Sequence, residues 1–405
     1  FEYLNDNESA TVVINYQVTD DHGGVSQSTV TITVDGVNDP AIIDGDDTKV
    51  LSETDAPLQT SGKLNVSDVD NTDEFVPQTG YVGKYGTFSI DAQGNWAFVA
   101  DEAYDYLNVN STPLVSEFIV ESVDGTEHTI QITIQGTNDA PVAFNSTENI
   151  DENDVLSSSV PTASDVDGTI AAYQLVNDVP SGQGTLSLNQ DGTFTFDTGT
   201  DFDYLAQGQQ TSVSFTYIAI DNNGTASEVK TVTINITGEN DSPSQITGPL
   251  IGNVEEDGTQ LANGQLTVVD ADQGASHTWS ALGQTDSTYG DFGITADGFW
   301  TYNLDNDKAQ ELAKGQIITE RFVVQADDGL GGTISQTVTI TITGENDEPT
   351  ITNITTNNNV EEDNALANMV TGDLGVTDVD LQDGHTWSID GQEATSGTAA
   401  SINAT

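Results

Sequence analysis

Residues 337–349 read TVTITITGENDEP, and three further stretches of the chain repeat this pattern. Thr alternates with Val or Ile, and this period of two predicts a β-strand with one buried face. A glycine ends the strand, and the Asn-Asp pair and proline that follow prevent a regular element from continuing. The four copies are residues 29–40, 129–141, 231–243 and 337–349. Their recurrence predicts a tandem array of β-rich units.

The Asn-Asp pairs of the four copies are spaced 100, 102 and 106 residues apart, and we refer to their surroundings as junctions 1 to 4. They are Asn38-Asp39, Asn138-Asp139, Asn240-Asp241 and Asn346-Asp347. The expected domains are unit 1 (1–38, the C-terminal part of a truncated repeat), the complete units 2 (39–138), 3 (139–240) and 4 (241–346), and unit 5 (347–405, the N-terminal part of a truncated repeat). Two partial units are expected of a window on a longer array. Alternatively, the tail of one copy completes the head of another in a fibre.

Inside the complete units, turn residues separate short strands at the spacing typical of an all-β sandwich. Each unit contains a predicted hairpin whose turn ends in glycine. The hairpins are residues 86–98 with Gln93-Gly94, 184–196 with Asp191-Gly192, and 290–302 with Asp297-Gly298. The predicted fold class is therefore all-β, a row of immunoglobulin-like Greek-key sandwiches joined end to end by short linkers.

The aromatic residue after each hairpin turn is Trp96, Phe194 or Trp300. A buried position in the core is more typical for it than an exposed sugar platform. The one helix candidate is Asn306–Lys314, with Gly315 as a plausible helix stop.

The chain carries 66 acidic and 7 basic residues, a formal net charge of -59. This excess excludes a nucleic-acid groove and repels anionic membranes, so cations are the natural partners. A hydrophobic content of 35% with many β-branched residues argues against disorder. There is no cysteine to stabilise thin cores, so bound metal is the leading alternative. We expect neither a membrane span nor a signal peptide in this segment.

Two acidic groups recur in the first third of each unit. A Glu stands near the start, and an Asp-x-Asp motif follows the junction Asp by some 26 to 33 residues, where both carboxylates would share one face of a strand. The first group is Glu53, Glu152, Glu255, Glu256, Glu361 and Glu362, and the second is Asp68/Asp70, Asp165/Asp167, Asp270/Asp272 and Asp378/Asp380.

Two further acidic groups recur later in each unit, one near its middle and one before the final strand. The mid-repeat group is Asp101/Asp105, Asp201/Asp203 and Asp305/Asp307, echoed by Glu2, and the last group is Asp20, Asp124, Asp221 and Asp327. Carboxylates without His or Cys clusters favour Ca²⁺, which binds six to eight oxygens. Any single Asp is equally well explained as a turn former, but recurrence of all four groups favours metal. Val176 stands where an EF-hand loop starting at Asp165 would need Glu.

The hairpins, the Asp-Gly before the last strand and the closing GENDEP sequence resemble the VCBS repeats of giant bacterial (RTX-type) adhesins, and the unit is also similar to cadherin. The resemblance covers nearly the whole chain, and residues 243–349 match best. It implies Ca²⁺ held between successive sandwiches. The implied ligands are Glu53, Asp101 or Asp105, Asn138, Asp139, Asp165, Asp167 and Asp221 at junction 2, and Glu152, Asp201, Asp203, Asn240, Asp241, Asp270, Asp272 and Asp327 at junction 3.

The chain departs from the cadherin pattern in its linkers and its mid-repeat acids. Cadherin linkers carry an Asp two residues before the Asn, where this chain has Gly36, Gly136, Gly238 and Gly344. The mid-repeat acids also lie closer to the Tyr-Leu pair. These departures leave open how many ions each linker binds.

The resemblance implies a calcium-rigidified extender of a secreted or cell-surface bacterial adhesin, with roles in cell adhesion and biofilm, whose partners are its neighbouring repeats and whose ligand-binding tip lies elsewhere. An enzyme is not expected, because every acidic cluster recurs in every unit and no nucleophile motif is present. Two alternatives stay open: carbohydrate- or peptide-binding sandwich modules, and a fibre-forming matrix protein. The four His are expected to be surface or strand residues; they are His22, His128, His277 and His385.

Overall fold

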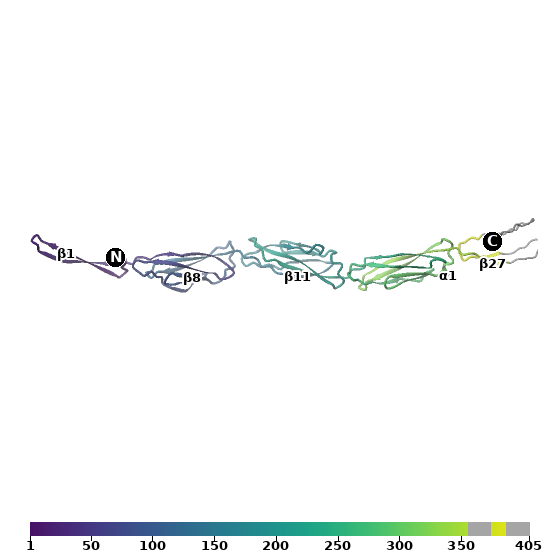
Figure 1. The fold of residues 1–405 in the computed structure, drawn as a ribbon, viewed down its shortest axis with the longest axis horizontal. Coiled ribbons are helices and arrows are strands. Elements are labelled where there is room, and N and C mark those ends of the chain that lie inside the picture. Colours follow the sequence, from purple (N-terminus) through teal and green to yellow (C-terminus); the bar gives the residue numbers. More distant parts are fainter. Residues whose placement is uncertain (355–373, 386–405) are drawn as a thin grey trace, which may run out of the picture.

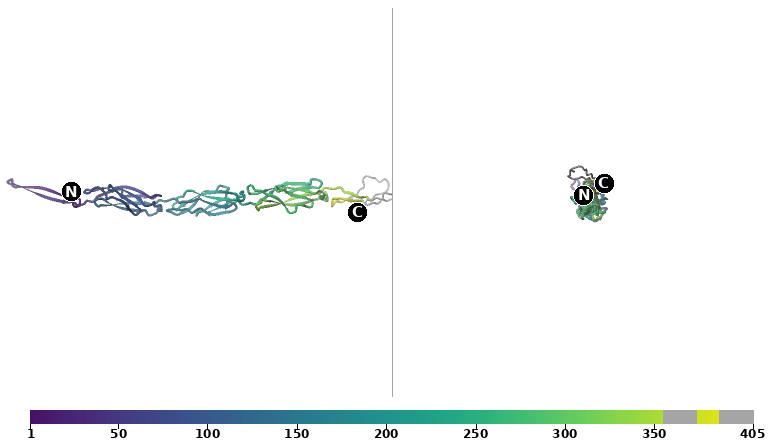
Figure 2. Two further views of the ribbon diagram at one scale, coloured as in Figure 1. Left: turned by 90° about the horizontal axis from the view of Figure 1, so that it is seen from below. Right: turned by 90° about the vertical axis from the view of Figure 1, so that its right-hand side faces the viewer.

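The computed structural model describes residues 1–354 and 374–385 and shows an elongated molecule (Figure 1). Three sandwich units follow one another along a single line, with a two-stranded hairpin at the N-terminal end. Seen along the long axis, the units lie behind one another (Figure 2). Strands hold 52% of the residues and helices 1%, so the predicted all-β class is confirmed.

Unit 3 has the simplest arrangement, two sheets of four and three strands. The parallel pair β11–β17 and the antiparallel strands β16 and β13 form one sheet, and β12, β15 and β14 form the other. The strands are β11 (Ser146–Asp151), β12 (Val155–Ser159), β13 (Ile170–Asn177), β14 (Thr185–Leu188), β15 (Thr193–Asp197), β16 (Gln210–Asp221) and β17 (Lys230–Thr237).

Unit 4 repeats this plan in the sheets β19-β26-β25-β22 and β20-β24-β23, with a small β18-β21 pair. Its elements are β18 (Gln245–Thr247), β19 (Ile251–Glu255), β20 (Leu261–Gln265), β21 (Thr267–Val269), β22 (Thr278–Leu282), β23 (Gly290–Ile294), β24 (Phe299–Leu304), α1 (Asn306–Ala309), β25 (Ile317–Asp327) and β26 (Thr333–Thr343).

Unit 2 differs in one strand, because β6 pairs with β7 and so extends the sheet β3-β5-β8-β7-β6, leaving three strands in β4-β10-β9. Its strands are β3 (Ile42–Gly45), β4 (Thr48–Ser52), β5 (Gln59–Ser67), β6 (Gln78–Val82), β7 (Gly86–Ile90), β8 (Asn95–Ala100), β9 (Leu114–Glu121) and β10 (Glu127–Gln135). The partial units contain β1 (Ser9–Thr19) with β2 (Val25–Asp35), and β27 (Thr350–Ile354) with β28 (Leu374–Thr377).

The copies of the quoted strand lie in the cores of the three complete units, whereas the copy in unit 1, within β2, is almost wholly exposed, contrary to the expectation of one buried face. In β26, Val338, Ile340 and Ile342 are fully buried while the threonines between them are partly exposed, as the period of two predicts. The three hairpins form as expected, and the aromatic residue after each turn is buried. The exposed fractions are 2% for Trp96, 1% for Phe194 and 0% for Trp300, which confirms their core role.

The helix is shorter than expected. It covers only Asn306–Ala309, whereas the sequence pattern predicted residues 306–314. The chain tightens after this turn, because the N–H of Leu312 bonds to the carbonyl of Ala309, three residues earlier and not four. Ala309 and Leu312 are both buried in the core. Packing of these two apolar side chains therefore replaces the rest of the predicted helix.

Candidate metal sites at the junctions

Each linker is attached to the following unit through one repeated hydrogen bond. The backbone N–H of the linker Asp donates to the second carboxylate of the Asp-x-Asp motif, although 28 to 33 residues separate the two. The bonds run from Asp39 to Asp70 (3.0 Å), from Asp139 to Asp167 (3.3 Å), from Asp241 to Asp272 (3.1 Å) and from Asp347 to Asp380 (3.1 Å). Motif and linker therefore meet at all four junctions.

The Asp-x-Asp motif does not lie in a strand, contrary to the expectation that its carboxylates share a strand face. It follows a strand end in units 2, 4 and 5, where β5 ends at Ser67, β21 at Val269 and β28 at Thr377. In all four copies the first carboxylate accepts the backbone N–H of the second Asp, for example Asp270 Oδ1 from Asp272 at 3.1 Å. This side-chain-to-backbone bond competes with strand pairing and closes a turn instead.

The Glu near the start of each complete unit bonds to the linker that follows that unit. Glu53 Oε1 accepts the N–H of Thr137 at 2.8 Å, and Glu152 Oε1 accepts that of Glu239 at the same distance. Glu256 Oε2 accepts the N–H of Glu345 at 3.1 Å. All three Glu side chains are buried. Each linker is thus bonded to a carboxylate from the unit before it and to one from the unit after it.

Many carboxylate oxygens at the junctions are buried and have no hydrogen-bond partner. At junction 2 they are Glu53 Oε2, Asp105 Oδ1, Asp139 Oδ2, Asp165 Oδ2 and Asp167 Oδ1. At the other junctions they are Asp68 Oδ2, Glu152 Oε2, Asp241 Oδ2, Asp272 Oδ1, Asp347 Oδ2 and Asp380 Oδ1. Ligand oxygens of Glu152, Asp241 and Asp272 all lie within 4.8 Å of one another.

Buried carboxylates without partners are strongly unfavourable unless a cation or a proton compensates them. The donor set is oxygen only at these clusters, and it combines carboxylates with linker backbone, which fits Ca²⁺ and not zinc or copper. The residues at the junctions therefore fit a hard divalent cation. Within the described residues, the other cluster of possible metal ligands is Asp20, Asp21 and His22, and it is fully exposed.

The pKa values of the central carboxylates show how strongly the charges interact. Burial, followed by the charges of Glu53, Asp167 and other acids, raises the pKa of Asp139 to about 6. Burial, together with the charges of Asp241 and other acids, raises the pKa of Glu152 to about 7, although the hydrogen bond from the N–H of Glu239 acts to lower it. Burial likewise raises the pKa of Glu256 to about 7. A bound cation would relieve this repulsion.

The acids before the final strand hold the linker Asn, with one change of residue. Asn138 Nδ2 donates to Asp221 Oδ2 at 2.6 Å, and Asn38 Nδ2 lies 3.5 Å from Asp124 Oδ2. At junction 3, Asn240 Nδ2 donates to Asp328 Oδ2 at 2.9 Å, whereas the exposed Asp327 accepts the N–H of Gly329. The sequence pattern selected Asp327. Asp328 is the structural equivalent of Asp221, because its N–H bonds to the carbonyl of Gly332 as that of Asp221 bonds to the carbonyl of Thr225. Aligning the two turns would have identified it.

The mid-repeat acids divide into two groups. Asp105 contributes to the raised pKa of Asp139, and Asp203 contributes to that of Glu152, so both lie at junctions. Asp201 instead accepts the N–H of Gly184, and Asp305 pairs with Lys308 at 3.0 Å. Four further candidates, Glu2, Asp101, Glu255 and Asp307, are exposed. Glu361 and Glu362 lie outside the described residues.

Two histidines contradict the expectation that all four are surface or strand residues. His277 Nε2 lies 2.6 Å from Asp270 Oδ2, and the two side chains are 11% and 4% exposed. His385 Nε2 lies 3.1 Å from Asp378 Oδ2, and these two side chains are 25% and 6% exposed. Both histidines follow the first Asp of the motif by seven residues, a spacing that the first two units lack. The repetition of this spacing was the signal that sequence reasoning missed.

The linker glycines explain the main departure from cadherin. A Cβ on Gly136, Gly238 or Gly344 would collide with a backbone carbonyl of the mid-repeat loop, at Leu107, Leu205 or Ala313. A larger residue is therefore excluded where cadherin has Asp, because the loop lies directly against the linker.

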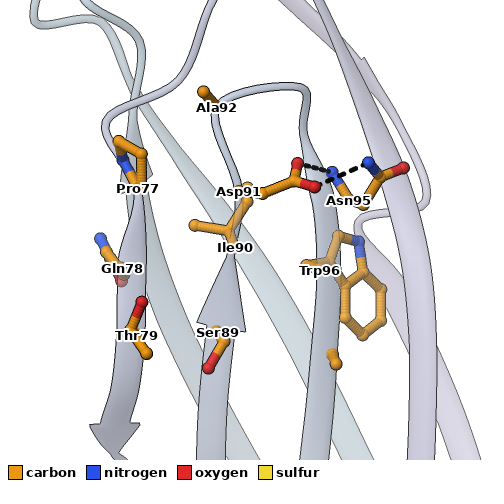
Figure 3. A pocket seen from close by; sticks show the side chains of 10 residues that line it. Pro77, Gln78, Thr79, Ser89, Ile90, Asp91, Ala92, Asn95 and Trp96 are labelled. Atoms are coloured by element: carbon orange, nitrogen blue, oxygen red, sulfur yellow. Dashed lines mark hydrogen bonds between the residues drawn. The ribbon is translucent and has the colours of Figure 1, made fainter.

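One surface hollow in unit 2 bears on the alternative of a sugar-binding module. A hollow of about 350 Å³ lies beside the hairpin of unit 2, lined by Gln78, Ile90 and Trp96 among others (Figure 3). Asp91 at its rim is held by both donors of Asn95, at 2.8 Å each. Trp96 is buried and donates its indole N–H to the carbonyl of Asp46 at 2.8 Å. Its ring face is therefore unavailable for stacking on a sugar.

The profile of the bacterial cadherin-like domain family matches residues 138–238 and 240–344, just over half of the chain. The chain belongs to this family. Units 3 and 4 coincide closely with the two matched segments. Bacterial cadherin-like domains are adhesion-type modules and not enzymes, and their tandem arrangement means that neighbouring repeats are their immediate partners. No helix in residues 1–354 or 374–385 is long and apolar enough to cross a membrane.

Several solved cadherin structures are similar to this bacterial cadherin-like chain at low identity. Domains 1–5 of protocadherin gamma B2 share 16% identity over 84% of this chain and 67% of that one, with a TM-score of 0.47. Drosophila N-cadherin domains 1–4 share 18% identity over 83% of this chain and 84% of that one (TM-score 0.37), and mouse cadherin-23 domains 22–24 share 15% over 76% and 99% (TM-score 0.45). No curated protein sequence matches the chain.

Proposed function

We propose that this chain is a calcium-stiffened extender from a large secreted or surface-attached bacterial adhesin of the VCBS-repeat, RTX type. The observation that carries the proposal is the set of buried, unpartnered carboxylate oxygens at the junctions, which at junctions 2 and 3 come from the unit before the linker, the linker itself and the unit after it. A cation bound there would join two rigid sandwiches through charged contacts from both sides. Cadherin-like domains generally bind Ca²⁺, which agrees with this oxygen-only donor set.

At junctions 2 and 3 the proposed ligands fall into three groups. The preceding unit provides the buried Glu and the mid-repeat Asp, the linker provides Asn and Asp, and the following unit provides the Asp-x-Asp motif. At junction 3 these are Glu152, Asp203, Asn240, Asp241, Asp270 and Asp272, and Asp328 faces the linker Asn. The proposed domain boundaries coincide with these linkers.

The setting of such a segment is extracellular, where millimolar Ca²⁺ keeps sites of modest affinity filled. The partners are the neighbouring repeats of the same chain, and adhesion to a surface and biofilm formation would depend on a tip outside this segment. The strongly negative charge keeps separate chains apart while cations bind at the junctions.

Calcium removal tests the proposal directly. A ligand that binds only the folded state stabilises it by RT ln(1 + [Ca²⁺]/Kd), about 2.7 kcal/mol per site at 100 times Kd. We therefore expect calorimetric melting to occur at a markedly lower temperature in chelator than in millimolar Ca²⁺, with Mg²⁺ at equal ionic strength as the control. An unchanged melt would remove calcium from the proposal.

Small-angle scattering tests the mechanical part. Charge repulsion alone extends the chain only within a screening length of about 10 Å at 0.1 M salt, so the calcium-loaded form should be the more rod-like one. Identical interdomain distance distributions with and without Ca²⁺ would show that the junctions are not stiffened by the ion.

A further inference from the structure

One position of the mid-repeat loop carries a carboxylate at two junctions and an amide at the third. It stands two residues before a buried Leu whose N–H bonds to a carbonyl three residues back, so the loops are structurally equivalent. The residues at this position are Asp105 in unit 2, Asp203 in unit 3 and Gln310 in unit 4. Junction 4 therefore lacks the mid-repeat carboxylate that junctions 2 and 3 have.

The residue directly after the buried Glu shows the opposite distribution. Thr54 follows Glu53 and Asn153 follows Glu152, so this turn position is uncharged in units 2 and 3. In unit 4 Asp257 follows Glu256. The carboxylate that is missing from the mid-repeat loop is thus present in a neighbouring turn of the same unit, in contact with Gln310.

Asp257 is fixed by side chains from the mid-repeat loop. Its backbone N–H donates to Asn306 Oδ1 at 2.9 Å, and Asn306 Nδ2 donates back to Asp257 Oδ1 at 2.6 Å. Gln310 Nε2 lies 3.2 Å from the same oxygen and 3.0 Å from Glu256 Oε1. Asp257 has a φ of 52°, a conformation that Asp and Asn tolerate better than most residues.

The carboxylate of Asp257 lies beside that of Glu256 at junction 4, because Gln310 Nε2 bonds to an oxygen of each. Burial and then the charge of Asp257 raise the pKa of Asp347, and Asp257 also contributes to the raised pKa of Glu256. Asp380, only 3% exposed, directs its unpartnered Oδ1 into the same cluster. Asp257 itself is exposed, which puts it at the solvent-facing rim.

We propose that Asp257 is a direct ligand of the divalent cation at junction 4, in place of the mid-repeat carboxylate of junctions 2 and 3, and that Asn306 and Gln310 are its positioning residues. The inference rests on the proposed calcium function. Its rival is that Asp257 only forms the turn. The two differ in charge, because Asn in place of Asp keeps the turn and the Oδ1 acceptor but removes the negative ligand.

The test follows amide hydrogen exchange of the linker peptides in the full chain while free Ca²⁺ is titrated. Each linker reports its own junction, so residues 136–142 and 238–244 are internal controls for residues 344–350. We call the Ca²⁺ concentration at which a linker is half protected from exchange its half-protection Ca²⁺ concentration. We expect Asp257→Asn to raise this concentration at least about tenfold for the fourth linker, residues 344–350, and to leave those of the other two linkers unchanged. Adding Gln310→Asp to this variant should restore the parent value to within about threefold, because it recreates the arrangement of junctions 2 and 3.

Asp307→Asn is the matched control, since this exposed residue of α1 loses the same charge from the mid-repeat loop, next to Asn306, and is not among the residues bonded to Asp257. It should leave all midpoints unchanged. An unaltered fourth-linker midpoint in Asp257→Asn would overturn the inference, as would an equal shift in Asp307→Asn, which would indicate a diffuse charge effect. If no linker of the parent chain responds to Ca²⁺, the proposed function itself fails, and the two failures are thereby distinguished.

Discussion

Junctions 2 and 3 hold the linker through the same hydrogen bonds, but the first Asp of the Asp-x-Asp motif has a side-chain partner at only one of them. In both, a buried Glu and the second motif Asp hold the two sides of the linker. At junction 2 Asp165 Oδ2 is buried without a partner. At junction 3 the equivalent oxygen of Asp270 lies 2.6 Å from His277 Nε2. The same acids are therefore left uncompensated at one junction and partly compensated at the next.

The hydrogen bonds that join the two flanking units directly also differ between junctions 2 and 3. A backbone bond crosses junction 3, from Gln273 N–H to the carbonyl of Tyr204 at 2.9 Å. At junction 2 a side chain makes the crossing, from Asn108 Nδ2 to the carbonyl of Asp167 at 3.1 Å. Junction 3 thus has more order built in without an ion, and junction 2 depends more on what binds there. Successive repeats of one array can differ in their demand for calcium.

The largest expected difference comes from removing the motif charges. Asp165→Asn with Asp167→Asn should raise the half-protection Ca²⁺ concentration of the second linker on the order of a hundredfold, because two charged ligands are lost. Asp270→Asn with Asp272→Asn should have a smaller effect on the third linker, since Asp270 already shares an oxygen with His277. Titration calorimetry and linker hydrogen exchange measure both.

Both double variants should keep the fold of their units, because Asn forms these turns about as well as Asp. Parent affinity in either variant would mean that the motif is structural at that junction. Equal losses at the two junctions would show that His277 does not change the contribution of Asp270.

Acidification in chelator should stabilise the metal-free chain. This stabilisation should begin at a higher pH at junction 3 than at junction 2. The folded pKa of Glu152 is raised to about 7 and that of Asp139 to about 6, both above their ordinary values. The stability linked to each group is therefore fully present below its unfolded pKa and is lost as pH rises through the folded pKa. We expect the chelator melt to rise in temperature from pH 8 to pH 5.

Glu152→Gln is the matched variant for this pH series. It removes the group that titrates near pH 7, so the stability gain between pH 8 and pH 6 should shrink, while Glu53→Gln at junction 2 should change it less. If Glu152→Gln retains the full dependence, general relief of the net negative charge is responsible and not the buried Glu.

The sequence predicted most of the fold because the same signals occur in every unit. The alternation in β26 and the burial of Trp300 follow from pattern alone, since both depend on local periodicity and one apolar face. The helix at Asn306 was predicted too long because core packing of Ala309 and Leu312 outweighs helix propensity. Tertiary packing of this kind cannot be read from a local window.

The candidate sites were predicted as groups and missed as individual residues. Recurrence located the linker and the Asp-x-Asp motif, which the structure brings together at all four junctions. It selected Asp327 and not Asp328, because both acids precede the final strand and only the folded turn shows that Asp328 is the one that bonds to the linker Asn. It also missed His277, although the seven-residue spacing recurs at His385. It could not find Asp257, because this residue departs from the repeat and its contacts exist only in the folded chain.

The smallest expected effect isolates His277. Replacing it with Asn removes the ring nitrogen next to Asp270 and leaves a buried carboxylate oxygen as poorly compensated as that of Asp165. In chelator, exchange at linker 238–244 should then become faster, toward that of linker 136–142, and stability should fall by about 1 kcal/mol, the usual contribution of one hydrogen bond. The gain in stability on adding Ca²⁺ should increase correspondingly, because the ion then compensates a charge that the imidazole compensated before. Linker 344–350, next to the intact His385, should not change and serves as the internal control. Unchanged exchange of linker 238–244 in chelator would show that the imidazole contributes nothing to the order of junction 3, and that the two junctions differ only in the bonds that cross them.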